Sequence, residues 1–239
     1  MIKIDGYILE EDENLVAVSK PSGLLTIPDR EGKEVSLKQI LKNRYGEIFT
    51  VHRLDKDTSG IVVFAKNEEA HKQLSRLFEA RETIKTYNGL VLGSPFEKSG
   101  VINDPIAEHP VKKGLMTVYK KGKESITEYE VLENFKLYSW MQFHILTGRT
   151  HQIRVHMKHL GHPVVCDELY GDGKPVFISS IKRKTFHLSK NEEEEKPILS
   201  RLALHASQLK FELNNKTYEL KAELPKDLKA LLQQLRKNK

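Results

Sequence analysis

The sequence predicts an α+β fold in which a mixed, largely antiparallel sheet is flanked by helices. The first observation is a hairpin, because strand patterns at 209–213 and 217–222 are joined by Asn214-Asn215, a pair that favours a tight turn. The second is the continuous apolar run 61–65, which is typical of a strand covered on both faces. The third is a small number of amphipathic helical patterns between the strands.

Local signals place the elements of the first half of the chain. The pattern at 15–19 predicts a strand, and the turn 20–23 leads the chain out of it. After the apolar strand, Asn67 is expected to cap a helix whose positive end suits Glu68 and Glu69. The buried stripe of this helix is expected to be Ala70, Leu74, Leu77 and Phe78.

A second helix is predicted after residue 150, where Thr150 is expected to cap its start and Gly161 to end it. Its inward stripe is expected to be Ile153, Met157 and Leu160. The remaining expected elements are a strand at 85–92 that carries Tyr87, an alternating strand at 138–146 and a last amphipathic helix at 228–235.

Composition limits the class of protein. The one cysteine, Cys166, excludes an internal disulfide and any multi-cysteine metal site. The longest apolar run, 61–65, is far shorter than the roughly 20 residues that span a bilayer. The N-terminal segment is too acidic for a signal peptide. We therefore expect a soluble, cytoplasmic protein that forms a single domain, 1–239, because no repeat or linker divides the chain.

The chain is moderately basic, with 39 Lys and Arg against 33 Asp and Glu and a net charge of +6. Such an excess is compatible with a nucleic-acid partner without requiring one. The basic residues gather in two places, each of which is alternatively a solvated loop. These places are Lys112, Lys113, Lys120, Lys121 and Lys123, and the shorter run Lys182, Arg183 and Lys184.

Two segments carry the residues best suited to chemistry. The segment 52–60 ends in turn residues immediately before the buried strand, so it presents the Asp55 carboxylate from a rigid element. On the helix predicted after Thr150, His151 and Arg154 share one face. The Arg154 guanidinium would keep Asp55 ionised if the two paired. The alternative is that both are surface charges with separate roles.

These segments and their neighbours resemble the RluA-type pseudouridine synthases, in the order that the family shows. The resemblance covers most of the chain, and five short motifs in sequence make it specific. The motifs are Lys20-Pro-Ser-Gly-Leu24, His52-Arg-Leu-Asp-Lys-Asp-Thr-Ser-Gly60, Lys85-Thr-Tyr87, Gly148 to His156 with Gly161-His-Pro163 and Asp167 to Gly171, and Arg201 to Ala206.

The resemblance implies a pseudouridine synthase fold with a catalytic cleft. It also implies isomerisation of a uridine in RNA, without cofactor or metal. Asp55 is then the catalytic carboxylate, which either attacks the sugar or removes a ribose proton, and Arg154 pairs with it. Tyr87 resembles the aromatic residue that stacks on the flipped base and assists removal of the proton at carbon 5, so the catalytic set implied is Asp55, Tyr87 and Arg154. The substrate-binding set is Arg53, which fills the gap left by the flipped nucleotide, Leu204, which packs beneath the uracil ring, and His52, which orients its neighbours.

The partner implied is a structured ribosomal or transfer RNA, and we expect a monomer. The chain reaches its first motif within about twenty residues, which leaves no room for the separate N-terminal RNA-binding domain of some relatives. We therefore expect the lysine-rich segment 112–123 and the loop 182–190 to contribute to RNA selection.

The sequence allows three other interpretations. Asp55-Lys-Asp-Thr58 matches the DxDxT string of haloacid-dehalogenase phosphotransferases, but the apolar strand follows the motif here instead of preceding it. A metal site at His156, His159 and His162 is disfavoured because their spacing fans them around a helix that Gly161 ends. A non-catalytic RNA-binding protein remains an alternative, although Asp55 would weaken RNA affinity unless it served chemistry.

Overall fold

The computed structural model describes residues 4–29, 31–182 and 194–239. The chain folds into two compact units, and each unit is built from three separate stretches of sequence. The first unit comprises Met1–Tyr87, His144–Thr150 and Leu204–Glu223, and the second comprises Asn88–Phe143, His151–Ala203 and Leu224–Lys239. Neither unit can be separated by a single cut in the chain, and the expectation of a single domain stays a prediction.

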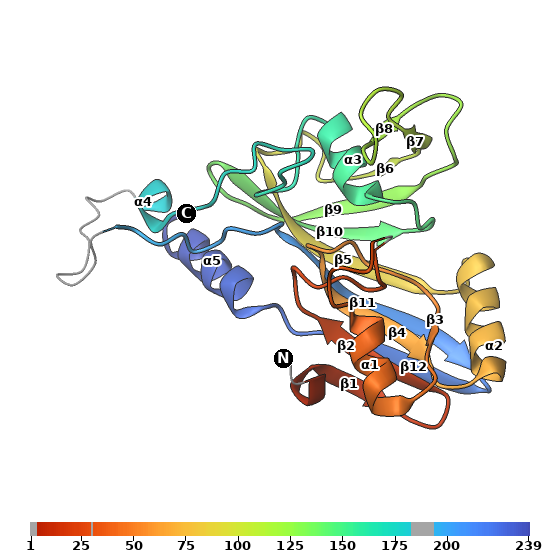
Figure 1. Ribbon diagram of the computed structural model, residues 1–239. Helices are drawn as coiled ribbons and strands as arrows, with labels where there is room; N and C mark the ends of the chain where they lie inside the picture. The colour runs from red at the N-terminus through yellow and green to blue at the C-terminus, as the bar shows by residue number, and fades with distance from the viewer. Residues whose placement is uncertain (1–3, 30, 183–193) are drawn as a thin grey trace. The chain divides into compact units, whose positions relative to one another are not determined.

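The first unit is a sheet with helices on its two faces (Figure 1). Its strands run in the order β1-β2-β4-β11, followed by the first residues of β5, while β3 pairs with β4 and β12 pairs with β11. The elements are η1 Ile4–Tyr7, β1 Ile8–Glu11, β2 Leu15–Lys20, α1 Leu37–Tyr45, β3 Phe49–Thr50, β4 Ser59–Ala65, α2 Glu68–Glu79, β11 Leu204–Leu213 and β12 Lys216–Lys221.

Strand β4 is buried along its whole length because a helix covers each face of the sheet. Ile61 and Val63 belong to the core that contains Ala70 and Leu74 of α2. The side chains between them point to the other face, where they join Leu37 and Leu41 of α1. The expectation of a strand covered on both faces is confirmed.

Two local expectations in this unit are also confirmed. The Asn67 side chain accepts a hydrogen bond from the Ala70 N–H at 2.8 Å and so caps α2. Asn214 and Asn215 join β11 to β12 with φ angles of 51° and 60°. Both lie in the left-handed region that a two-residue hairpin turn of this kind requires.

The second unit contains the sheet β5-β10-β9-β6 and a separate hairpin, β7–β8 (Figure 1). Strands β5 (Ile84–Leu92) and β10 (Tyr138–Ile145) contribute residues to both units. The other elements are β6 Ser99–Ile102, β7 Ile106–Glu108, β8 Met116–Val118, β9 Thr127–Asn134, α3 Gln152–His159, α4 Ile178–Ile181 and α5 Lys226–Lys237. A small core of Ile106, Val155 and Tyr170 joins α3 to the hairpin.

The start of α3 differs from the expectation. Its N-cap residue is His151, at a φ of 56°, and no side chain caps the helix. Thr150 was therefore wrongly expected to cap it; its hydroxyl instead accepts a hydrogen bond from Arg53. Leu160 was wrongly placed in the inward stripe, since it lies beyond the last helical residue and is 39% exposed.

Among the described residues, no helix is long and apolar enough to span a membrane.

The pairing of β4 with β11 depends on a glycine. The two strands are parallel over Ser59–His205 and Gly60–Ala206, and Gly60 has a φ of 115°. A Cβ atom at Gly60 would lie 2.6 Å from the Ala206 nitrogen and would also meet its carbonyl oxygen. No L-residue fits this position without moving one strand away from the other.

We expect Gly60→Ala to lower the free energy of unfolding by more than about 2 kcal/mol, because the added methyl group overlaps backbone atoms. Gly148→Ala is the matched control, since a Cβ there meets nothing within 4 Å. Urea unfolding followed by circular dichroism measures both. Equal stability of the two variants would show that the strands tolerate separation.

Candidate active site

Asp55 lies in the loop between β3 and β4, in the first unit. Its side chain is partly buried, whereas the preceding Leu54 is fully buried in the core on the α1 face of the sheet. The loop makes no strand ladder of its own, so its carbonyl groups need other partners. The turn after β2 supplies them.

The Lys20 ammonium is the centre of this support. The side chain is only 1% exposed, and its Nζ donates hydrogen bonds to three backbone carbonyls. These are the carbonyls of Pro21 at 3.0 Å, Leu24 at 2.7 Å and Lys56 at 2.8 Å. A buried ammonium with three acceptors is well satisfied, and here it ties the turn to the residue that follows Asp55.

Further hydrogen bonds from the same turn hold the residues on each side of Asp55. The Thr26 hydroxyl donates to the Leu54 carbonyl at 2.8 Å and accepts from the Leu54 N–H at 3.2 Å. The Ser22 hydroxyl donates to the Asp57 carbonyl at 2.7 Å, and the Gly23 N–H donates to the Lys56 carbonyl at 2.9 Å. The backbone before and after Asp55 is therefore fixed from one side.

Tyr87 of β5 lies in the same unit and packs against the core that contains Leu54. Burial raises the pKa of its hydroxyl, and the negative charge of Asp55 raises that pKa further. The phenol therefore stays neutral at physiological pH. The structure thus brings Tyr87 within electrostatic reach of Asp55.

Leu204 is the first residue of β11 and is buried. The Ser59 hydroxyl donates to the Leu204 carbonyl at 3.4 Å and lies 2.9 Å from Nδ1 of the next residue, His205. Leu204 is therefore joined to the start of β4, four residues after Asp55. Its packing beneath a uracil ring stays a prediction.

His52 has a structural hydrogen bond within the first unit. Its Nε2 accepts from the Val63 N–H at 3.0 Å, next to the Thr50–Phe64 pair of β3 and β4, and its ring stacks on Phe78 with centroids 4.6 Å apart. Burial, together with the positive charge of Lys85, lowers the pKa of His52 to about 3. The neutral ring is the form that this hydrogen bond requires. Its part in substrate binding stays a prediction.

Arg53 is an exposed residue of this loop. Its Nη2 donates to the Thr150 hydroxyl at 3.2 Å, which holds the guanidinium against the segment that precedes α3. Its insertion into an RNA stack stays a prediction.

Arg154 belongs to the second unit and is buried in α3, with 4% of the residue exposed. Its Nε and Nη2 each donate to a carboxylate oxygen of Asp167 at 2.7 Å, and its guanidinium lies 5.1 Å from the centre of the Tyr170 ring. Asp167 is 1% exposed and also accepts from the Leu169 and Tyr170 N–H groups. The guanidinium plane is thus fixed by a two-point ion pair and an aromatic face. The pairing of Arg154 with Asp55 stays a prediction.

Helix α3 is anchored on both sides of Arg154. The Gln152 amide donates to the Thr127 hydroxyl and to the Ile126 carbonyl, both at 2.9 Å. His156 is buried, and its ring nitrogens lie 2.9 Å from the Thr127 hydroxyl and 2.9 Å from the Asp104 carbonyl. Both ring nitrogens of His156 therefore attach α3 to Thr127 and Asp104. His156 is one of the three histidines of the disfavoured metal site.

Tyr170 also links α3 to the hairpin β7–β8. Its hydroxyl accepts from the Met116 N–H at 2.9 Å and lies 2.7 Å from Nδ1 of His151. The five lysines of the segment 112–123 are exposed on and after this hairpin, where a phosphate backbone can reach them. Of the second basic segment, residues 183–190 lie outside the described part of the chain.

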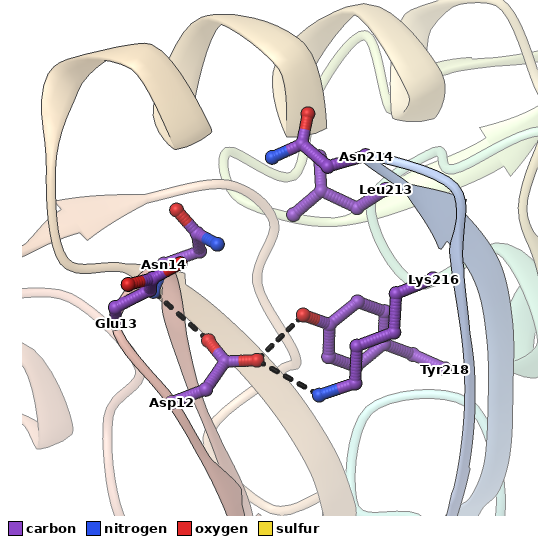
Figure 2. A pocket seen from close by; sticks show the side chains of 7 residues that line it. All are labelled: Asp12, Glu13, Asn14, Leu213, Asn214, Lys216 and Tyr218. Carbon is purple, nitrogen blue, oxygen red and sulfur yellow. Dashed lines mark hydrogen bonds and ion pairs between the residues drawn. The ribbon is translucent and has the colours of Figure 1, made fainter.

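A hollow of about 440 Å³ lies between the hairpins β1–β2 and β11–β12 (Figure 2). Asp12 accepts hydrogen bonds there from the Tyr218 hydroxyl and from Lys216 (Figure 2). Burial alone would raise the pKa of Asp12, but these hydrogen bonds and two from backbone N–H groups lower it to about 2. The polar groups satisfy one another, so this cluster fastens the two hairpins together.

Sequence reasoning assigned no role to several residues that shape these sites. Lys20 and Asp167 lie inside recognised motifs, but the partners that tie them to other segments, Lys56 and Arg154, are 36 and 13 residues away, respectively. Thr26 lies outside every motif singled out. One local signal was available. Lys20 ends an apolar strand, and a lysine buried at such a position needs hydrogen-bond acceptors nearby.

We expect Asp167→Asn to lower the free energy of unfolding by about 3 kcal/mol, because it removes the negative charge from a two-point ion pair that is almost completely buried. Asp227→Asn is the matched control, since Asp227 also forms a two-point pair with an arginine, Arg201, but its side chain is 37% exposed. That change should cost about 1 kcal/mol or less. Chemical denaturation of both variants measures the difference, and equal losses would contradict the argument.

The lowered pKa of His52 predicts a dependence of stability on pH. The unfolded state takes up a proton near pH 6.5 and the folded state only near pH 3. Stability is therefore lost as the pH falls between these values. From pH 7.5 to pH 5, the wild type should lose about 2 kcal/mol more than His52→Gln, which keeps a hydrogen-bond acceptor but does not titrate. Urea titrations at both pH values measure this, and equal pH dependence would refute it.

Comparison with known proteins gives a consistent result. The family model for RNA pseudouridylate synthases matches residues 14–159. The ribosomal large subunit pseudouridine synthase D of Buchnera aphidicola subsp. Schizaphis graminum is 36% identical over 236 residues, which cover 95% of this chain and 72% of that protein. The protein of the same name from Haemophilus ducreyi is 34% identical over 245 residues, 96% of this chain and 70% of its own length.

Two solved human structures are also similar. RNA pseudouridylate synthase domain containing 4 has a TM-score of 0.73 and 26% identity, over 98% of this chain and 94% of that one. RNA pseudouridylate synthase domain containing 1 has a TM-score of 0.71 and 26% identity, over 96% and 94% of the two chains. The expected mixed, largely antiparallel sheet with flanking helices is thus confirmed as the fold of these proteins.

Proposed function

Because this chain belongs to the RNA pseudouridylate synthase family, we propose that it converts a uridine of ribosomal RNA to pseudouridine with Asp55 as its catalytic carboxylate. The chain is an RNA pseudouridine synthase, an isomerase that acts on RNA. The choice of ribosomal over transfer RNA is supported by the names of its bacterial relatives. The role of Asp55 is supported by its position in the loop that Lys20 and Thr26 hold.

The reaction rearranges bonds within one nucleotide. The bond between uracil N1 and the ribose C1′ breaks, the base turns, and C5 bonds to C1′ in place of N1. The C5 proton leaves and N1 gains one, so no atom or electron is gained overall. The protein needs a carboxylate at the sugar, a surface that retains the loose base and a route for one proton.

Asp55 supplies the carboxylate in either of two roles, attack on the sugar or removal of a ribose proton. Both require the ionised form. An Arg154 guanidinium directed at Asp55 would hold it ionised, since an opposite charge nearby favours the charged form of a carboxyl group. The Asp167 and Tyr170 contacts fix the plane of that guanidinium in advance.

Tyr87 supplies the surface for the base. Extruding a nucleotide from a stack costs a few kcal/mol, and stacking on an aromatic ring returns about 1–3 kcal/mol. With Leu204 beneath the ring, the site would retain a detached uracil between apolar walls. The neutral phenol of Tyr87 can relay the C5 proton only if it passes its own hydroxyl proton to a base beside it. The Asp55 carboxylate lies within its electrostatic reach.

Arg53 is proposed to occupy the gap that the flipped nucleotide leaves, and His52 to orient the loop from which Arg53 projects. Phosphate contacts by the exposed lysines of 112–123 would add salt-sensitive affinity. We also propose that the enzyme acts as a monomer in the cytoplasm, the compartment in which its RNA substrate would be met.

Asp55→Asn should lower the rate of pseudouridine formation by about 10³-fold or more, because the amide can neither attack the sugar nor accept a ribose proton. RNA affinity should be retained or rise slightly, since a negative charge facing the RNA is removed. Carbodiimide mapping of total RNA, ribosomal and transfer RNA included, from cells that lack the gene, complemented with either form, measures activity. Filter binding measures affinity.

Glu69→Gln is the control, because it removes an equal charge from an exposed position on α2. It should restore every pseudouridine that the wild type restores. Turnover by Asp55→Asn would refute the catalytic role. Restoration of sites in transfer RNA alone would replace the proposed ribosomal substrate.

A further inference from the structure

Lys85 is a partly buried lysine to which nothing above assigns a role. It lies in β5, two residues before Tyr87. Side chains two apart on a strand lie on the same face, separated by about 7 Å along the strand. The Lys85 and Tyr87 side chains therefore leave β5 from the same face.

The surroundings of Lys85 tie it to the Asp55 loop. Its Nζ lies 5.8 Å from the centre of the Phe78 ring, and the same ring stacks on His52. Its positive charge is close enough to His52 to lower the pKa of that imidazole. All of these residues belong to the first unit, so β5, α2 and the loop meet at this ammonium.

Within the described part of the chain, no carboxylate lies within ion-pair distance of Lys85 Nζ. Burial and the positive charge of Arg81 both lower the pKa of this ammonium, so its setting disfavours the charge it carries. A partly buried charge without a counter-charge is costly. Packing against Phe78 would be served as well by a methionine, which carries no such cost.

We propose that Lys85 binds a phosphodiester group that flanks the uridine stacked on Tyr87. The inference rests on the proposed function, because the RNA brings the missing counter-charge. A spacing of about 7 Å along the strand suits a base and the phosphate beside its own ribose. The lysine ammonium is a point charge on a flexible chain, so it can bind whichever phosphate oxygen faces the protein.

The test uses the full-length protein and a short RNA stem-loop that contains a uridine the wild type converts. In two further copies of this RNA, a neutral methylphosphonate replaces the phosphate on the 5′ or the 3′ side of that uridine. We expect one of the two replacements to weaken binding to the wild type about tenfold. Lys85→Gln should bind the unmodified RNA about tenfold more weakly and show no further loss with that replacement.

Lys210→Gln is the matched control, since Lys210 is an exposed lysine on another strand of the same unit. It should keep the full effect of the methylphosphonate. Lys85→Met provides a second variant that preserves packing on Phe78 and should behave as Lys85→Gln does. The slope of log affinity against log salt concentration should fall by about one in both Lys85 variants.

A full methylphosphonate effect in both Lys85 variants, with an active wild type, would overturn this inference and leave the proposed function standing. The same holds if neither replacement affects the wild type. Failure of the wild type to form pseudouridine in any RNA would overturn both.

Discussion

One buried ammonium holds the central loop of this protein. A strand ladder usually satisfies the carbonyl groups of a segment that precedes a buried strand, but residues 54–57 have no such partner strand. Lys20 takes its place, since it reaches one of these carbonyls and two in its own turn with three donors. An ammonium group has no acceptor of its own to satisfy, so Lys20 helps to fix the loop without adding a new hydrogen-bonding requirement. The position of Asp55 depends on this contact and on the reciprocal pair between Thr26 and Leu54.

The second unit fixes Arg154 by a different means. In the first unit, neutral backbone carbonyls surround the Lys20 ammonium. In the second, the negatively charged Asp167 pairs with the Arg154 guanidinium, and both side chains are almost completely buried. Buried pairs of this kind add little net stability, but they define direction strongly because two parallel hydrogen bonds leave no freedom to rotate. Each unit therefore holds one charged side chain, Asp55 or Arg154, in a fixed position.

The sequence predicted what neighbouring residues decide. The strand 59–65, the Asn67 cap and the Asn214-Asn215 hairpin follow from contacts within a few residues, and each is confirmed. The helix α1 has a capping box of Ser36 and Gln39 that short-range reasoning can recognise, although it was not singled out. The cap expected at Thr150 was wrong because the His151 backbone adopts the left-handed conformation. No local sequence pattern predicted this conformation. The contact of Lys20 with Lys56 and the pair of Arg154 with Asp167 join residues far apart in the sequence, so the sequence could name the charged residues but not these partners.

The solitary cysteine has a practical consequence. Cys166 is 4% exposed, with its thiol directed at the carbonyls of Lys174 and Leu199, and burial raises its pKa to about 11. Thiol reagents attack the thiolate, which is scarce at neutral pH under these conditions. The native chain should thus give almost no background in maleimide labelling. Fluorophores or spin labels attached to cysteines introduced on the β7–β8 hairpin would then report its motion during RNA capture without any need to remove the native thiol.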